Sequence, residues 1–206
     1  MTALIVRILY ATTVALKTPV VVGILLLLAW SLFETGRCLR EAWERRRQSA
    51  RWRQRATALA EHPDPDIMEV FGLLGGEAAP GWLRRLVPET AGLAPEGCRA
   101  RLETLLQEAE FAATARLSRL RIGLRLGPVL GLMGTLIPMG PALLSVSRGD
   151  LSMMSTDLII AFGTTVAGLL VGALCYVMLT LRQHWYARDV ADLERLAGAA
   201  SWRAQA

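Results

Sequence analysis

The chain has little of the chemistry that enzyme and metal sites usually need. It contains one lysine, two histidines and three cysteines among 206 residues. His62 and His184 lie far apart in the sequence, so we expect neither to bind a metal. Cys38, Cys98 and Cys175 match no zinc-site spacing, and the glycine-rich stretch between them lacks the lysine of a phosphate-binding loop. We therefore expect no enzyme activity, no metal, no disulfide and no cofactor.

Charged residues are missing from three long stretches. These stretches cover residues 18–33, 126–147 and 158–181. A helix needs about 20 apolar residues to cross the bilayer core. The second and third stretches are long enough alone, and the first becomes so because Lys17 can extend its ammonium group to the headgroups. A cleavable signal peptide is the alternative for the first, but Trp30 and Phe33 leave no small-residue cleavage site at its end. We predict an all-α integral membrane protein with three transmembrane helices.

Positive charge is concentrated in two parts of the chain. Sixteen arginines lie between the first and second stretches and four follow the third, whereas only Arg7, Lys17 and Arg148 lie elsewhere. The positive-inside rule therefore predicts an outer N-terminus and a cytoplasmic C-terminus. The arginine run 45–55 can bind nucleic acid in principle, but beside a membrane anchor it is more simply a topology signal that contacts anionic lipid. We expect membrane lipid as a partner and no nucleic acid.

These boundaries divide the chain into seven parts. They are an extracytoplasmic or interfacial segment 1–17, transmembrane helix 18–33, a cytoplasmic helical region 34–125 with a Pro/Gly-rich connector 62–96, transmembrane helix 126–147, an extracytoplasmic loop 148–157, transmembrane helix 158–181 and a cytoplasmic helix 182–206.

Long helices are expected to continue from the spans into the cytoplasm. Residues 34–61 contain no proline, and the connector has room for short helices near 66–74 and 81–86. The helical pattern resumes at Pro95, a favourable first position. One apolar stripe then follows at helical spacing: Leu102, Leu106, Ala109, Ala113, Leu117 and Leu120. This stripe has to pack either within one chain or against copies of the chain, and the pattern alone does not decide between them.

Small residues recur on one face of the second and third spans. The second has Gly127, Gly131, Gly134, Pro138 and Pro141 at steps of four, three, four and three, and the third has Ala161, Thr165, Gly168 and Gly172 at four, three and four. Small residues let helix backbones approach closely in lipid. We predict that Gly127, Gly131, Gly134 and Gly172 pack helices together.

Three threonines are the polar side chains deepest in these two spans. Thr135, Thr164 and Thr165 can satisfy their hydroxyls on carbonyls of their own helix, or they can line a narrow polar path. Pro138 frees a backbone carbonyl nearby, and such polarity is tolerated where it is buried or wetted. No carboxylate, histidine or lysine lies within any span. If protons pass here, the titrating group must come from a partner.

Two segments carry a resemblance to a known family. The segments GPVLGLMGTLIPMGPAL (127–143) and AFGTTVAGLLVGAL (161–174) resemble the two pore-lining helices of the MotA/TolQ/ExbB proton-channel family. The expected three spans with an outer N-terminus are similar to TolQ and ExbB. The resemblance implies a homopentamer in a bacterial-type inner membrane, around a single-span partner like TolR, ExbD or MotB. The partner's transmembrane Asp would carry the proton, and the assembly would act as a stator that turns proton motive force into mechanical work.

The resemblance also assigns residues. Thr135 and Thr165 match the pore threonines of the family, Gly168 matches the glycine after the second of them, and Ala161 matches the small residue that opens the third-span motif. The predicted pore-lining set is Thr135, Thr165, Thr164, Ala161, Gly168 and Pro138. The close pair Pro138 and Pro141 and the short connector depart from the family pattern. A membrane scaffold without ion flux is the alternative, and a solute transporter is third because no inverted repeat is present.

Overall fold

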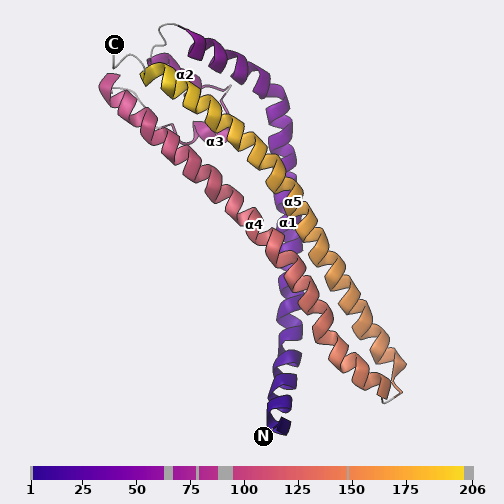
Figure 1. Ribbon diagram of the computed structural model, residues 1–206. Coiled ribbons are helices and arrows are strands. Elements are labelled where there is room, and N and C mark those ends of the chain that lie inside the picture. The colour runs from indigo at the N-terminus through magenta and orange to yellow at the C-terminus, as the bar shows by residue number, and fades with distance from the viewer. Residues whose placement is uncertain (1, 63–66, 78, 88–94, 148, 202–206) are drawn as a thin grey trace. The chain divides into compact units, whose positions relative to one another are not determined.

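The described residues are mostly helical and include no strand. The computed structural model describes residues 2–62, 67–77, 79–87, 95–147 and 149–201. The helices are α1 Thr2–Glu61, α2 Ile67–Gly75, α3 Gly81–Arg84, α4 Pro95–Ser147 and α5 Leu151–Ser201 (Figure 1). Stretches within three of them are long and apolar enough to cross a membrane: Ala11–Arg46, Arg101–Ser147 and Leu151–Ala199. The all-α prediction and the prediction of three long membrane helices are therefore confirmed.

The helix ends follow local chemistry. Helix α4 starts at Pro95, as expected, because proline has no N–H to lose at a first helical position. Between α4 and α5, Gly149 has a φ of 75°, which a side chain would strain. Asp150 then caps α5, since its Oδ1 accepts a hydrogen bond from the backbone N–H of Met153 at 3.0 Å. A compact turn therefore joins the two helices.

The contacts group the chain into two compact units. Residues 1–37 and 119–179 form the first, here called the span unit, and residues 38–118 and 180–206 form the second, here called the charged unit. Helices α1, α4 and α5 each contribute a segment to both. The three apolar stretches fall almost entirely in the span unit.

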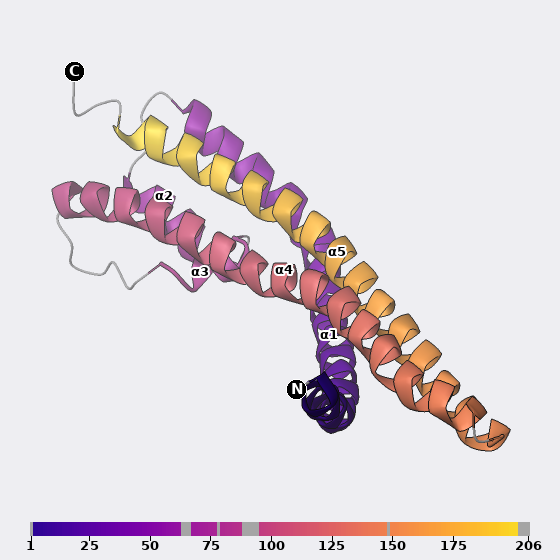
Figure 2. The same ribbon diagram turned by 60° about the horizontal axis from the view of Figure 1, so that its bottom comes forward.

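The centre of the span unit is a close contact between α4 and α5, whose segments run side by side in both views (Figures 1 and 2). A Cβ atom placed on Gly168 would lie 2.5 Å from the carbonyl oxygen of Gly127 and 2.8 Å from Cα of Gly131. One placed on Gly172 would lie 3.0 Å from Pro128 Cγ. Real Cβ atoms do not come within 3.0 Å of other backbone atoms, so position 168 requires glycine. We call this contact the glycine seam.

Helix α1 covers one side of the glycine seam. Val20 and Ile24 of α1 form a buried apolar cluster with Ile137 of α4. Three partly buried residues pack against it: Leu130, Met133 and Ala167. Ile137 and Ala167 therefore mark the faces of α4 and α5 that point toward α1.

The charged unit has its own core. The predicted α4 stripe is buried here at Leu102, Ala109, Ala113 and Leu117, and its last residue, Leu120, is buried in the span unit. Leu105 is buried as well, whereas Leu106 is only partly so, so the second position of the stripe is Leu105 and not Leu106. On α5 the buried residues include Tyr186, Leu193 and Leu196. The stripe is thus covered within a single chain.

The glycine seam predicts a sharp difference between two glycines on α5. Gly168→Ala should destabilise the protein by roughly 1–3 kcal/mol, because the added methyl group must push two backbones apart. Gly163→Ala is the matched control, since a Cβ there meets nothing within 4 Å, and alanine favours the helix by about 1 kcal/mol over glycine. Thermal unfolding in detergent measures both. Equal unfolding temperatures for the two variants would contradict the seam.

Candidate functional site

Thr135 and Thr165 lie on the side of the glycine seam that α1 leaves uncovered. Thr135 is two residues before Ile137, and Thr165 is two residues before Ala167. At 3.6 residues per turn, residues two apart point about 160° apart. Because Ile137 and Ala167 face the α1 cluster, the two threonines face away from it. Both side chains are partly exposed in the single chain.

The hydroxyls of these threonines are held close to the seam. The Thr135 hydroxyl donates to the carbonyl of Leu132 at 2.8 Å. The Thr165 hydroxyl lies 3.2 Å from the carbonyl of Ala161 on its own helix and 3.4 Å from the carbonyl of Gly131 on α4. Gly131 is one turn before Thr135, so both threonines sit at the same level of the seam. Each oxygen keeps lone pairs that can accept a further hydrogen bond.

Thr164 is placed differently from its neighbour. It is 7% exposed, and its hydroxyl donates to the carbonyl of Ala161 at 2.8 Å. A Cβ on Gly134 would lie 2.5 Å from the Thr164 hydroxyl oxygen and 3.3 Å from Ile24 Cδ1. Thr164 therefore fills the space that Gly134 leaves open, on the side that α1 covers. In one chain this is a packing position.

The other predicted pore-lining residues are also buried within the chain. Ala161 is 3% exposed, Pro138 is among the fully buried side chains, and Gly168 lies in the seam. Pro138 has no N–H to donate to the carbonyl of Gly134, one turn earlier on α4. The sequence prediction that these residues line a pore stays a prediction.

The spans contain no carboxylate, imidazole, amine or guanidinium group of their own. No Asp, Glu, His, Lys or Arg lies in residues 126–147 or 158–181. Among the described residues no group of three metal-ligating side chains is close enough to hold an ion. The arrangement can hydrogen-bond a carboxylate or water, but it offers no carboxylate, imidazole or amine as a proton acceptor.

An ion pair at one end of the span unit was not predicted from the sequence. Lys17 Nζ of α1 lies 2.7 Å from Asp157 Oδ1 of α5. Asp157 is 4% exposed, although it comes directly before the third apolar stretch. The available signals were that Lys17 is the only lysine and that Asp157 precedes Ala161 by one turn on the small-residue face. Neither signal pairs two residues 140 positions apart.

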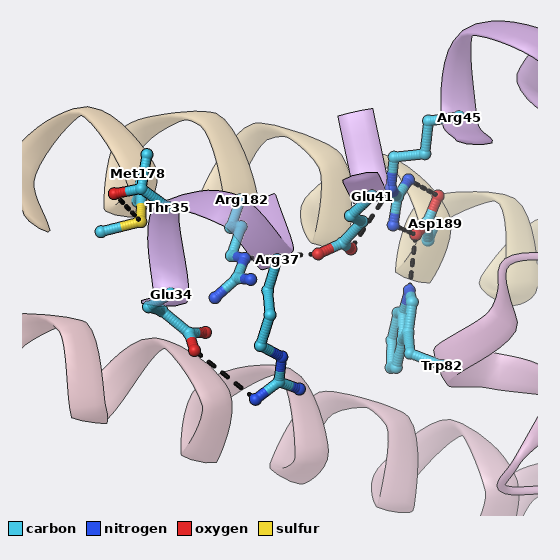
Figure 3. Close-up of polar contacts among 9 residues, drawn as sticks. All are labelled: Glu34, Thr35, Arg37, Glu41, Arg45, Trp82, Met178, Arg182 and Asp189. Atoms are coloured by element: carbon cyan, nitrogen blue, oxygen red, sulfur yellow. Dashed lines mark hydrogen bonds and ion pairs between the residues drawn. The ribbon is translucent and has the colours of Figure 1, made fainter. Parts of the chain in front are cut away.

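A second buried cluster, in the charged unit, was also missed. Asp189 of α5 accepts hydrogen bonds from both terminal guanidinium nitrogens of Arg45 in α1, at 2.6 and 3.1 Å (Figure 3). It also accepts a hydrogen bond from the indole N–H of Trp82 in α3, at 2.7 Å. The Trp82 ring also stacks at a tilt on Tyr186, with centroids 5.1 Å apart. Asp189 and Trp82 are each 5% exposed. Asp189 therefore joins three helices through one carboxylate.

Further charges extend this cluster. Glu41 lies 3.5 Å from Arg45 and 3.3 Å from Arg182, and Arg182 is 5% exposed. Burial lowers the pKa of Arg45, but the hydrogen bond and charge of Asp189 and the charge of Glu41 raise it by more, so the net shift is upward. Burial, aided by the charge of Glu41, raises the pKa of Tyr186. The cluster therefore brings two acidic side chains, Glu41 and Asp189, together with two arginines, Arg45 and Arg182.

One known protein family matches the part of the chain that contains the second and third apolar stretches. The sequence profile of the MotA/TolQ/ExbB proton channel family matches residues 78–195, more than half of the chain. The match includes all of the glycine seam and the three threonines. The chain belongs to this family. Neither the comparison with curated proteins nor the comparison with solved structures gives a match.

The Asp189 cluster predicts a large cost for removing one charge. Asp189→Ala leaves the largely buried Arg45 guanidinium without its main partner, and breaking a buried pair costs about 3–5 kcal/mol. Glu44→Ala is the matched control, because Glu44 and its partner Arg40 are exposed and 3.9 Å apart. Exposed pairs contribute only about 0–1 kcal/mol. Denaturant unfolding of the full chain in detergent measures the difference, and similar losses in both variants would show that the cluster is not a stabilising centre.

Proposed function

We propose that the chain is the channel subunit of a stator-type complex that uses a proton gradient to do mechanical work. Membership of the proton-channel family supports the transport of protons. The observation that carries the proposal further is the position of Thr135 and Thr165: two hydroxyls at one level, partly exposed, on the side of the seam that α1 leaves uncovered. In this proposal they face a central cavity between copies of the chain.

The proton itself is carried by a partner in this proposal. The spans contain no carboxylate, so a single-span protein with a transmembrane Asp supplies the titrating group. A hydroxyl both donates and accepts, so it can bond either protonation state of that carboxylate. Thr135 and Thr165 would stabilise the partner's carboxylate as it loads and releases the proton.

Several copies of the chain would enclose the cavity. Large apolar side chains on the uncovered faces of α4 and α5 are exposed in the single chain, among them Leu132, Leu136, Phe162 and Leu169. Lipid or a neighbouring copy can cover them. We propose a homopentamer in a bacterial-type inner membrane, with an outer N-terminus and a cytoplasmic charged unit.

A scaffold without ion flux is the second candidate. One observation favours it: all three threonine hydroxyls already bond to backbone carbonyls. Threonines that only pack helices would be bonded in the same way. The two functions differ in what happens when the hydroxyls are removed.

Replacing each threonine by valine separates them. Thr135→Val and Thr165→Val should reduce partner-dependent proton flux in vesicles at least about tenfold, because a hydrogen bond to a charged group is worth roughly 1.5–3 kcal/mol. The pentamer should survive, seen by native mass spectrometry, because membrane hydrogen bonds contribute only about 0.6 kcal/mol to packing. Thr156→Val is the control, since Thr156 bonds its own helix in the same way but lies before the third span. Full flux in both test variants would assign the threonines to packing.

The proposed orientation is tested by labelling. A single cysteine at Gly149, in the exposed turn between α4 and α5, should react with an impermeant maleimide from outside the cell. A cysteine at Arg195, exposed on the charged-unit part of α5, should react only after the membrane is opened. Labelling is compared in intact cells and inverted vesicles. Reaction of the Gly149 position from the cytoplasmic side would overturn the orientation.

A further inference from the structure

The contact between α1 and the α4–α5 pair is almost entirely apolar. Val20 and Ile24 meet Ile137, with Leu130, Met133 and Ala167 around them. Apolar side chains of similar size fit one another after a slide of one helical turn, about 5.4 Å. In a membrane such a slide exposes no apolar surface to water, so hydrophobic burial does not oppose it. Something else has to select the register of α1.

The Lys17–Asp157 pair is placed to make that selection. It joins α1 to α5 at 2.7 Å, with the lysine side chain 34% and the aspartate side chain 6% exposed. On α1, Lys17 is one turn from Val20, on the same face as the apolar cluster. On α5, Asp157 is one turn from the buried Ala161. A slide by one turn would separate the charges and leave Asp157 buried without its cation.

The pair is poorly built for stability. Asp157 uses one oxygen for Lys17, and among the described residues its buried Oδ2 accepts no hydrogen bond. A buried charge pair with an unsatisfied oxygen gains little over two apolar side chains of similar size. Fixing one arrangement among several is the best-attested benefit of such a pair, as for polar residues in coiled-coil seams.

Two other contacts of α1 could also fix its register. Thr35 lies 3.6 Å from the Met178 sulfur (Figure 3), but a thioether is a weak acceptor and the same hydroxyl lies 2.7 Å from the carbonyl of Ser31. Trp30 is the main competitor, because a Cβ on Gly123 would lie 2.9 Å from its ring. A bulky ring over a glycine also fixes register by shape. The experiment has to separate the effect of the ion pair from the effect of the Trp30 ring.

We propose that the Lys17–Asp157 ion pair sets the register of α1 against the α4–α5 pair. In this register Ile24 lies over the contact between Gly134 and Thr164, and α1 closes that side of the seam. The proposal concerns the chain itself and does not depend on proton flux.

Cysteine cross-linking reports the register directly. In a background with the three native cysteines replaced by alanine, one reporter joins Ile24→Cys to Ile137→Cys, which belong to the same buried cluster in the observed register. The other joins Leu28→Cys to Ile137→Cys, which become neighbours only after a one-turn slide. A disulfide needs Cα atoms within about 7 Å, so the two reporters are distinct. With Lys17 and Asp157 present, the first should exceed the second at least roughly tenfold.

The decisive variant replaces both charges by apolar residues. Lys17→Met with Asp157→Leu should still fold and unfold at an equal or higher temperature, while the two cross-links approach equal yield. Lys17→Asp with Asp157→Lys should restore the preference for the first cross-link. Arg37→Gln is the control and should change nothing, because Arg37 pairs with Glu34 on its own helix.

Two results would overturn the proposal. A single register in the Met/Leu variant would assign the selection to Trp30 and Gly123. Loss of the preference in both the Met/Leu and the charge-swapped variants would show that the pair acts through some feature other than its attraction. Lys17→Met alone decides less, because it leaves a buried carboxylate uncompensated.

Discussion

The close approach of α4 and α5 is the constraint on which the rest of the span unit depends. Lipid provides no hydrophobic drive for two apolar helices to associate, so van der Waals contact between backbones has to hold them. Gly127, Gly131 and Gly168 make that contact possible because none of them carries a side chain. Once the two backbones touch, each helix has one face in the seam, and the positions of the remaining side chains around the seam follow. Helix α1 covers one side of the seam and leaves the other side uncovered, so the two sides differ.

The sequence predicted the long helices, but it did not predict which of their side chains face α1. The charge-free stretches identified the long helices, and small residues at steps of three and four lie where α4 and α5 meet. Thr164 and Thr165 are adjacent in the sequence, so periodicity alone could not show that one packs under Ile24 and the other faces away from α1. That distinction required the position of α1, whose Ile24 lies 140 positions before Thr164 in the sequence.

The charged contacts were hidden from the sequence for a related reason. Arg45, Trp82 and Asp189 come from three different helices, and none stands out from the many charged and aromatic residues around it. Arginines that look like solvated topology signals include Arg182, which is 5% exposed and paired with Glu41. A periodic pattern reports which face of a helix is apolar, but it does not report which acid on another helix reaches a given arginine. Such pairings depend on the complete packing.

The short turn at Gly149 and Asp150 has a mechanical consequence. Because it caps α5 directly after α4 ends, it leaves almost no slack between the two helices. The glycine seam joins them again within the span unit, at Gly127, Gly131 and Gly168. One helix of this hairpin therefore cannot rotate or slide while the other stays in place. Within the span unit, a displacement of α4 therefore has to carry the facing part of α5 with it.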